Sequence, residues 1–207
     1  MKSERYDADS ISERLQTTVI GHPVVFYERL GSTNDAARGE AGRHVPEGLV
    51  VVAGVQEKGR GRFQRHWVTP EGNIALSVVL YPVIQRLPYI VMMAPVATCR
   101  SIEAVTGLKA NIKWPNDVLV NEKKTCGILI ENELRSDGTA VAVVGIGINV
   151  GLQPVDFADI AATATSLEQE AGRPISRVDI TRRLLEEFDT LYCSVDDTLV
   201  YQEWRGL

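Results

Sequence analysis

The 207-residue chain has few of the residues from which disulfide frameworks and soft-metal sites are built. Its 3 cysteines form an odd set with wide gaps and no C-x-x-C pair: Cys99, Cys126 and Cys193. Its 3 histidines are isolated as well: His22, His44 and His66. These spacings exclude a disulfide framework and a zinc knuckle. We therefore expect no metal held directly by His or Cys ligands.

The sequence also lacks a long apolar run. Charged residues occur throughout the first 15 positions, so the apolar core of a secretion signal is missing. The longest apolar stretch, residues 90–99, is about half of the roughly 20 residues that a membrane span requires, and it contains Pro95. We expect no membrane partner and a cytoplasmic location.

No strong bias of composition is present. Hydrophobic residues make up 44% and charged residues 24% of the chain, which excludes collagen-like, coiled-coil and disordered classes. No internal repeat and no Pro/Gly/Ser linker divides it, so we predict one domain. A chain of this length buries roughly 70% of the surface that its extended form exposes, which is ample for a core without disulfides.

The net charge of −5 is unevenly distributed along the chain. Residues 55–67 carry +3 and residues 109–124 carry +2, which leaves −10 for the remainder. A cationic island in an acidic protein disfavours DNA as a partner, because DNA-binding domains present an extended basic surface. The pattern favours a small polyanion bound at one place.

Hydrophobic periodicity predicts an α+β fold, with helices before and after a block of strands. We expect helices over residues 34–41, 87–105, 176–192 and 196–204. We expect strands over residues 49–55, 73–81, 112–120, 127–134 and 140–150. The strand at 112–120 is expected to be interrupted at Pro115 and then resumed. Turn residues at 121–123 and 136–138 predict an antiparallel meander of the last three strands.

The most informative segment is residues 59–67, GRGRFQRHW, which follows a predicted strand. Its glycines let backbone N–H groups approach an anion, and its arginines can donate bidentate hydrogen bonds to carboxylate or phosphate: Arg60, Arg62 and Arg65. Trp67 offers a flat face on which a base can stack. A flexible basic surface loop beside a core tryptophan is the alternative interpretation.

Two lysine-containing segments have weaker signals. In KWPND, residues 113–117, Lys113 and Asp117 flank a strand break stiffened by proline, which can present both groups at one end of a sheet. An exposed salt bridge is the alternative. In KKTCG, residues 123–127, Lys124 lies close to a glycine at a strand start, and a solubilising hairpin is the alternative.

Two further segments combine small and polar residues. GIGIN, residues 145–149, lacks the third glycine and the following helix of a dinucleotide-binding motif, so a Rossmann fold is excluded. Its glycines, on a strand that ends at Asn149, indicate close approach of a ligand or another backbone. GSTN, residues 31–34, is explained by a helix cap, although in a pocket its polar groups could bind a polar ring.

In this order the segments resemble the biotin protein ligases. The similar motifs cover nearly the whole chain: GSTN at 31–34, Gln56, GRGR at 59–62 with Arg65 and Trp67, TPEGN at 69–73, KWPND at 113–117, KKxxGILIE at 123–131, GIGINV at 145–150 and ATSL at 164–167. The resemblance implies the fold of class II aminoacyl-tRNA synthetase catalytic domains, a mixed, largely antiparallel sheet flanked by helices. It also implies a biotin/lipoyl ligase catalytic domain over residues 25–207 after an N-terminal segment, 1–24. We expect neither the winged-helix DNA-binding domain nor the C-terminal SH3-like barrel of longer members.

The resemblance implies an ATP-dependent ligase that uses Mg²⁺ and acts in two steps. The biotin carboxylate attacks the α-phosphorus of ATP and gives biotinyl-5′-AMP and pyrophosphate. A lysine of a biotin carboxyl carrier protein then takes the biotinyl group and releases AMP. A lipoate- or octanoate-type ligase of the same fold and a non-catalytic biotin-binding module are the alternatives. An exposed sheet edge makes a homodimer a further expectation.

The resemblance also implies roles for individual residues. The biotin site comprises Ser32, Thr33, Asn34, Gln56, Arg60, Gly61, Arg62, Lys124 and Gly127. The ATP and adenylate site comprises Arg62, Arg65, Trp67, Lys113, Asn116, Asp117, Lys124 and Asn149, with Mg²⁺ near Asp117 and Asn149. The catalytic candidates are Lys124, Arg62, Asp117 and Lys113. Lys124 would bridge the biotin carboxylate and the α-phosphate, and Asp117 would orient or deprotonate the incoming lysine.

Two positions depart from the family pattern. Gln64 stands where the arginine loop usually has glycine, and a side chain that disfavours positive φ is expected to stiffen or reshape the loop. Cys126 stands where alanine is common, and we expect it to pack as a small hydrophobic residue. The loop at 58–66 is expected to order over the bound adenylate and to protect this reactive anhydride from water.

Overall fold

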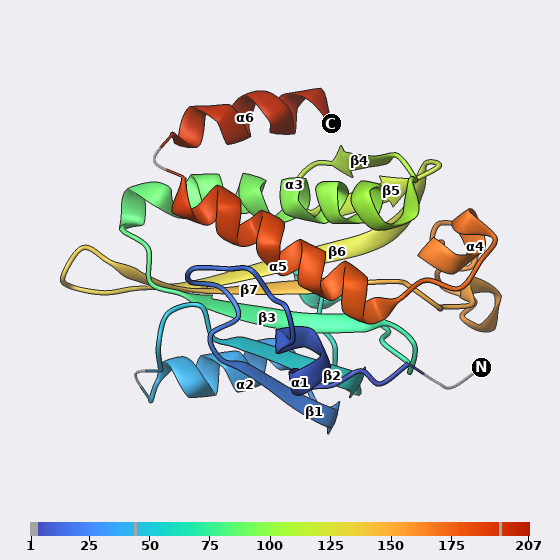
Figure 1. Ribbon diagram of the computed structural model, residues 1–207, viewed down its shortest axis with the longest axis horizontal. Coiled ribbons are helices and arrows are strands. Elements are labelled where there is room, and N and C mark those ends of the chain that lie inside the picture. Colours follow the sequence, from blue (N-terminus) through green and yellow to red (C-terminus); the bar gives the residue numbers. More distant parts are fainter. Residues whose placement is uncertain (1–3, 44, 195) are drawn as a thin grey trace.

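The computed structural model describes residues 4–43, 45–194 and 196–207; His44 and the side chain of Gln64 lie outside the described part. A seven-stranded sheet in the order β1-β2-β3-β7-β6-β5-β4 runs through its centre (Figure 1). The strands are β1 (Val24–Leu30), β2 (Val50–Gln56), β3 (Ile74–Leu80), β4 (Ala110–Lys113), β5 (Asp117–Val120), β6 (Lys123–Leu134) and β7 (Ala140–Ile148). β1 is parallel to β2, and all other neighbouring pairs are antiparallel. The predicted mixed, largely antiparallel sheet is confirmed.

Helices cover the two faces of the sheet unequally (Figure 1). On one face lie α3 (Leu87–Thr106), α5 (Arg177–Cys193) and α6 (Asp197–Gly206), whereas α2 (Thr33–Ala41) packs against β2, β3 and β7 on the other. The short elements are α1 (Ala8–Ser12), α4 (Leu167–Ala171), η1 (Arg62–Gln64), η2 (Ile84–Arg86) and η3 (Pro154–Asp156). Among the described residues, none of the helices combines the length and the apolar character needed to cross a membrane.

Alternation along the strands divides the apolar side chains between two cores. On β3, Leu76 and Val78 point into the large core beneath α3 and α5, while Val79 belongs to a small core beneath α2. The same period of two divides β7, with Val144 in the large core and Val143 in the small one. Because the small core covers only part of its face, alternate residues of β3, β6 and β7 on that side are left to line a cavity.

Local sequence signals account for several helix boundaries. The Ser32 hydroxyl accepts from the Asp35 N–H (3.5 Å), and α2 ends at Gly42, as predicted. The Ser176 hydroxyl accepts from the Asp179 N–H (3.0 Å) at the start of α5, which confirms the capping pattern there. α3 ends at a left-handed glycine (φ 78°), the predicted Gly107.

Two features differ from the expectations. The segment around Pro115 is a reversal instead of an interruption, because β4 and β5 pair antiparallel with Lys113 opposite Asp117. Three residues connect the two strands, so the polar residues of KWPND gather at one tight turn. β1 was not predicted, although its first four residues, VVFY, are β-branched and aromatic. It lies at the edge of the sheet and is mostly half-buried. β1, α2 and β2 form a parallel unit with α2 as the crossover.

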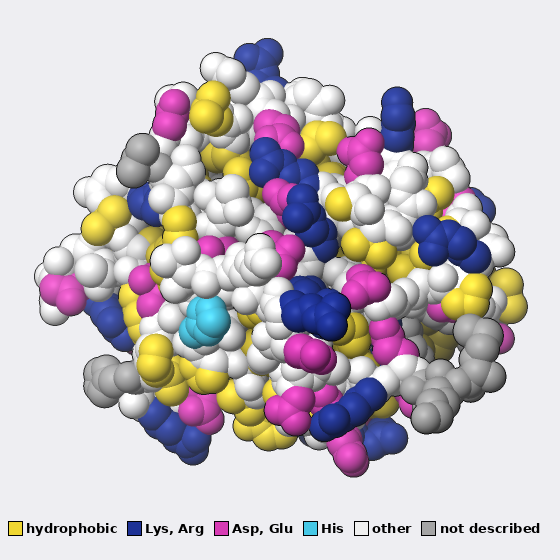
Figure 2. Space-filling model, in the orientation of Figure 1, with side chains coloured by type: hydrophobic (Ala, Val, Ile, Leu, Met, Phe, Trp, Pro, Cys, Tyr) yellow, Lys and Arg dark blue, Asp and Glu magenta, His cyan; other side chains and the backbone are white. Residues whose placement is uncertain are grey.

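The face that carries α5 and α6 shows cationic and acidic side chains next to one another, without a large area of either sign (Figure 2). Ion pairs join the three helices of this layer: Arg100 contacts Glu187 (3.0 Å) and Glu203 (2.5 Å). Within the layer, Arg183 also contacts Glu187 (2.5 Å). Charges on the helical layer therefore neutralise one another, and a site for a polyanion must be sought on the other face.

Candidate active site

A cavity of about 930 Å³ lies on the α2 side of the sheet. Every residue that the sequence assigned to the site lines it: Ser32, Thr33, Asn34, Gln56, Arg60, Gly61, Arg62, Arg65, Trp67, Lys113, Asn116, Asp117, Lys124, Gly127 and Asn149. Its volume is typical of a site for a cofactor-sized molecule. The arginine loop and the lysine segment, which are far apart in sequence, thus share one cavity.

Three glycines form the floor of the cavity and make room for two side chains. A Cβ atom at Gly145 would lie 2.1 Å from Asn34 Oδ1, and one at Gly147 would lie 2.2 Å from Trp67 Nε1. At Gly127 it would lie 2.9 Å from the Trp67 ring. In this structure, two side chains of the same protein approach the glycines of the GIGIN strand closely.

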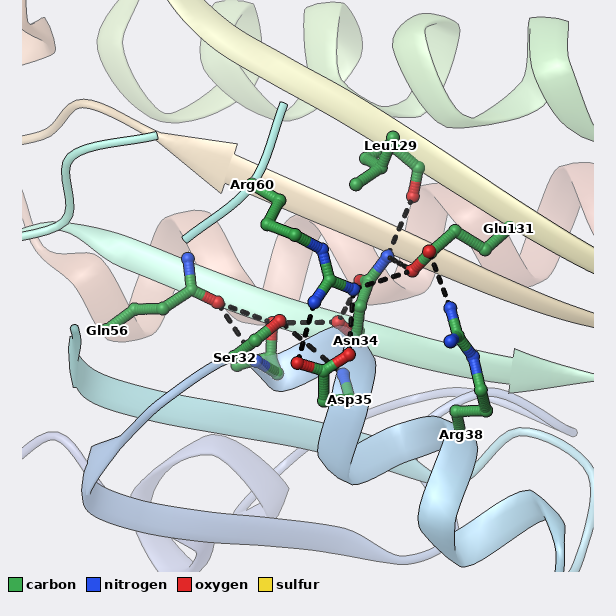
Figure 3. A network of polar contacts seen from close by, with 10 residues as sticks. Ser32, Asn34, Asp35, Arg38, Gln56, Arg60, Leu129 and Glu131 are labelled. Carbon is green, nitrogen blue, oxygen red and sulfur yellow. Dashed lines mark hydrogen bonds and ion pairs between the residues drawn. The ribbon is translucent and has the colours of Figure 1, made fainter. Parts of the chain in front are cut away.

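At one end of the cavity, Thr33, Asn34 and Gln56 form a polar network with Ser77 and the half-buried Glu131. Figure 3 shows Asn34, Gln56 and Glu131 of this network. Thr33 donates from its N–H (2.9 Å) and its hydroxyl (3.1 Å) to Gln56 Oε1. The Ser77 hydroxyl donates to Asn34 Oδ1 (2.6 Å), and Asn34 Nδ2 donates to Glu131 Oε2 (2.8 Å). These bonds fix the side chains at the start of α2 before a ligand arrives.

Arg60 of the loop connects to this network. Its guanidinium donates two hydrogen bonds of 2.7 Å to the Asp35 carboxylate and approaches Glu131 Oε2 at 3.4 Å (Figure 3). The hydrogen bonds from Arg60 hold the pKa of Asp35 below its ordinary value. Burial alone would raise the pKa of Glu131, but hydrogen bonds from Asn34 and Arg38 and the nearby guanidinium groups outweigh burial and lower it. Both carboxylates are therefore ionised at neutral pH.

Beyond the polar network, the same cavity is lined by four further cations, which we call the cationic end: Arg62, Arg65, Lys113 and Lys124. Lys124 Nζ lies 2.7 Å from Asp117 Oδ1 and 5.3 Å from the centre of the Trp67 ring. Arg62 Nη1 donates to Asn116 Oδ1 (3.3 Å). Asn116 and Asp117 are consecutive residues at the β4–β5 turn. The turn therefore contacts both the arginine loop, through Arg62, and the KKTCG segment, through Lys124. Cations from separate segments converge where they can bind one polyanion.

The arginine loop folds as a small hairpin. The Gly61 N–H donates to Arg65 O (2.8 Å), and the Trp67 N–H donates to Gly59 O (2.9 Å). The left-handed residue is Phe63 (φ 56°), whose side chain is 82% exposed at the rim of the cavity. Gln64 follows it in η1, and its side chain lies outside the described part. The positive φ is thus at the position before the one where the family glycine is expected.

One wall of the cavity escaped the sequence analysis, which noted only Ala164 from residues 159–164. The Lys124 N–H donates to Thr163 O (2.9 Å), and the Thr165 N–H donates to Lys124 O (2.9 Å). Asn149 Nδ2 in turn donates to Thr165 O (3.0 Å). This stretch has no regular periodicity, so no periodic signal in the sequence could have indicated that it pairs with β6 at Lys124.

Cys126 is fully buried in the large core, and burial raises the pKa of its thiol, which confirms that it packs as a hydrophobic residue. Among the described residues, no group of three or more His, Cys, Asp or Glu side chains is arranged to hold a metal ion. The cavity does contain the carboxylate of Asp117. That donor fits Mg²⁺, which proteins commonly bind through one or two carboxylates together with substrate phosphates.

Comparisons with known proteins identify the family of the chain. Residues 26–149 match the family model described as "Biotin/lipoate A/B protein ligase family". The chain is 42% identical over 182 residues to the "Bifunctional ligase/repressor BirA" of Bacillus subtilis, covering 86% of this chain and 56% of that protein. It is 34% identical over 153 residues to the "Biotin--[acetyl-CoA-carboxylase] ligase" of Paracoccus denitrificans, covering 70% of this chain and 63% of that protein. The chain thus spans less than two thirds of the length of either relative.

Among solved structures, the biotin protein ligase from Aquifex aeolicus in complex with biotin and ATP has a TM-score of 0.68 at 29% identity. The match covers 81% of this chain and 71% of that one. The family match runs from residue 26, within β1, to just past the end of β7, and it includes all the residues of the polar network and the cationic end. By sequence and by fold, the chain belongs to the biotin/lipoate A/B protein ligase family.

Proposed function

We propose that this protein is an ATP-dependent biotin ligase, which activates biotin as biotinyl-5′-AMP and transfers it to a lysine of a biotin carboxyl carrier protein. One observation carries the proposal: Thr33, Asn34 and Gln56 of the polar network line the same cavity as a cluster of cations from separate segments. The Paracoccus relative is named as a biotin ligase, and the similar Aquifex structure is a biotin protein ligase in complex with biotin and ATP.

The polar network suits the ureido ring of biotin. That ring has two N–H donors and one carbonyl acceptor, and the hydroxyl and amide groups of Ser32, Thr33, Asn34 and Gln56 offer partners of both kinds. Three of the four are nearly buried, with 3–5% of Ser32, Thr33 and Asn34 exposed. A bound ring would be held away from water, where each hydrogen bond discriminates strongly between ligands.

In the first step, a biotin carboxylate oxygen attacks the α-phosphorus, and the bond from that phosphorus to the bridging oxygen of pyrophosphate breaks. Two anions must meet, so their repulsion has to be neutralised. Lys124 is suited to contact both, since its ammonium lies in the cavity 2.7 Å from Asp117 and over the face of the Trp67 ring. Arg62, Arg65 and Lys113 would hold the phosphates, and Mg²⁺ bound with ATP near Asp117 and Asn149 would neutralise further charge.

In the second step, the amine of the carrier lysine attacks the acyl carbon, and the bond from that carbon to the phosphate oxygen breaks to release AMP. The amine must first lose a proton, because a free lysine has a pKa near 10.4. Asp117 is the carboxylate that lines the cavity beside Lys124. We assign it the role of orienting the amine or accepting that proton.

The lipoate alternative is weaker on chemical grounds. The dithiolane ring of lipoate has no N–H or carbonyl group, so the network would be left with polar groups that its ligand does not pair. A non-catalytic binding module would need the ring site but not the cations around Lys124. The cationic end therefore favours an enzyme.

The test is mass spectrometry of a carrier domain incubated with the protein, biotin, ATP and Mg²⁺. We expect the carrier to gain the mass of one biotinyl group only when ATP is present, and an Arg substitution of its acceptor lysine to abolish the gain. Lipoate in place of biotin should give no product. A lipoyl adduct in the absence of any biotinyl adduct would contradict the proposal, and biotin binding without AMP release would favour the binding module.

We further propose a cytoplasmic location and a homodimer that forms along β6. β5 pairs only with the first part of β6, so within the described part of the chain no strand covers the outer side of residues 129–134. An uncovered edge can pair with a second copy. Sedimentation at increasing protein concentration should detect the dimer, and a Pro substitution at Asn132 should abolish it.

A further inference from the structure

The three arginines of the loop are not equivalent in the structure. Arg60 is bound by the Asp35 carboxylate in a bidentate arrangement, with both distances 2.7 Å. Arg62 donates to the neutral Asn116, and Arg65 is exposed. Among the described residues, Arg60 is the one loop arginine that forms an ion pair with a carboxylate. The sequence GRGR alone gives no reason for this difference.

The partners of Arg60 belong to two different elements. Asp35 lies in the first turn of α2, where a carboxylate is also favoured by the helix dipole, and Glu131 lies on β6. Glu131 is in turn bound by Arg38 of α2 (2.5 Å). The loop is therefore joined through one side chain to both the helix and the sheet (Figure 3).

A single carboxylate oxygen links the loop to the polar network. Glu131 Oε2 accepts from Asn34 Nδ2 at 2.8 Å and lies 3.4 Å from Arg60 Nη2. Asn34 is held over Gly145 and also accepts from Ser77. A ligand that contacts Asn34 will therefore act on the same oxygen that helps to hold Arg60, because hydrogen bonds that share an acceptor influence one another.

We propose that Asp35 and Glu131 are positioning residues that anchor the arginine loop at Arg60 and couple its closure to occupation of the polar network. The anchor fixes the base of the loop next to the ring site and leaves Arg62 and Arg65 to reach the phosphates. This inference rests on the proposed function for its role in catalysis. The lowered pKa values of both carboxylates agree with an anchor that is intact at neutral pH.

The competing interpretation is that Arg60 leaves the carboxylates and binds the substrate. The two ideas predict opposite effects of removing the Asp35 charge. If the carboxylates anchor the loop, Asp35→Asn loosens it and weakens retention of the adenylate. If they only compete with the substrate for Arg60, Asp35→Asn releases the guanidinium and tightens binding.

The experiment is hydrogen exchange of the full chain without ligand, read at the Gly61 and Trp67 amides, whose hydrogen bonds close the loop hairpin. We expect Asp35→Asn and Arg60→Gln each to speed exchange by about tenfold. In the Arg60→Gln background, Asp35→Asn should add less than about twofold, because the partner is already missing. The control is Glu57→Gln, which removes an exposed ion pair with Arg29 (3.2 Å) and should leave both amides unchanged.

A second measurement uses preformed biotinyl-5′-AMP. Asp35→Asn should release or hydrolyse it about tenfold faster, and Asp35→Glu should restore retention. Unchanged exchange in Asp35→Asn, additive effects in the double variant, or tighter adenylate binding would each overturn the anchor. If the wild-type protein makes no adenylate, the proposed function fails, but the exchange measurement without ligand still decides whether the anchor exists.

Discussion

The two ends of the cavity are organised in opposite ways. At the polar network, Thr33, Asn34 and Ser77 are almost completely buried, and each bonds another protein group. At the cationic end, Arg62, Arg65 and Lys113 are exposed, and the contact of Arg62 with Asn116 is a single bond of 3.3 Å. The polar network is held in place by its own hydrogen bonds before a ligand binds, whereas the side chains of the cationic end can be ordered by the ligand.

Elementary electrostatics explains this difference. A buried neutral polar group is tolerable only when it is hydrogen-bonded, so a buried ring site must be a connected network. A cation without a partner is too costly to bury and stays in solvent until an anion enters. Lys124 is intermediate between these two cases. Its ammonium forms an ion pair with the Asp117 carboxylate (2.7 Å) and lies over the Trp67 ring. We therefore predict that the polar network determines which ring is bound, and that the cationic end determines the rate of adenylate formation.

The strongest way to test this division is Lys124→Ala. We expect biotin-dependent pyrophosphate exchange to fall by at least about a hundredfold, roughly 2.7 kcal/mol, because the two reacting anions lose their shared cation. Binding of biotin alone should change far less. Lys123→Ala, a change at the neighbouring exposed lysine, is the control and should exchange normally. Near-normal exchange in Lys124→Ala would remove the central role of this residue.

A smaller effect is expected for Asp117→Asn. Transfer from preformed adenylate to the carrier lysine should slow by at least about tenfold, because the amine loses a group that orients it or accepts its proton. Single-turnover transfer measures this step separately from adenylate formation. Glu122→Gln, another acidic residue at the cavity, serves as the control. An unchanged transfer rate in Asp117→Asn would exclude the role in the second step.

The glycine floor offers a test confined to the polar network. Gly145→Ala would place a Cβ atom 2.1 Å from Asn34 Oδ1, so Asn34 must move. We expect biotin affinity to fall by about tenfold, or roughly 1.4 kcal/mol, in titration calorimetry, with little change for ATP. Gly39→Ala, where nothing lies within 4 Å, is the matched control and should bind biotin normally. Equal losses for biotin and ATP would argue against two separable ends.

The smallest expected effect concerns pH. The folded protein lowers the pKa values of Asp35 and Glu131, so the stability that these carboxylates contribute is present above their ordinary values and is lost as pH falls through the lowered ones. The difference in unfolding free energy between wild type and Asp35→Asn should therefore be constant from about pH 8 to 5 and shrink below about pH 4. It should stay under about 1 kcal/mol, because the half-exposed pair is screened by water. Urea unfolding over this pH range measures it, and a difference that grows on acidification would contradict the anchor.

Much of the fold could be predicted because its signals are local. The cap at Ser32, the left-handed stop at Gly107 and the turns of the β5–β6–β7 meander depend on a few neighbouring residues. β1 was missed although it begins with VVFY, because periodicity alone does not distinguish a short apolar run in a strand from one in a buried helix. The reversal at Pro115 was missed because a strand interruption and a tight turn have the same short-range pattern.

For the candidate site too, one part could be predicted from the sequence and another part could not. Its residue types could be predicted, since anion binding calls for arginine, lysine and glycine wherever it occurs. Their individual contacts could not. Gly145 and Gly147 are equivalent in sequence, yet one accommodates Asn34 and the other Trp67. The wall at residues 159–164 carries no periodic pattern, so only its backbone hydrogen bonds to Lys124 reveal it.

By itself, the sequence determined the secondary structure of most segments, the location of positive charge and the family to which the motifs belong. Tertiary structure alone decided that Arg60 is bound by Asp35 and Glu131 while Arg62 is left to reach a ligand. The reason is physical: spacing along the chain specifies what each segment can form, but pairing between segments depends on sheet register and on which face each side chain occupies.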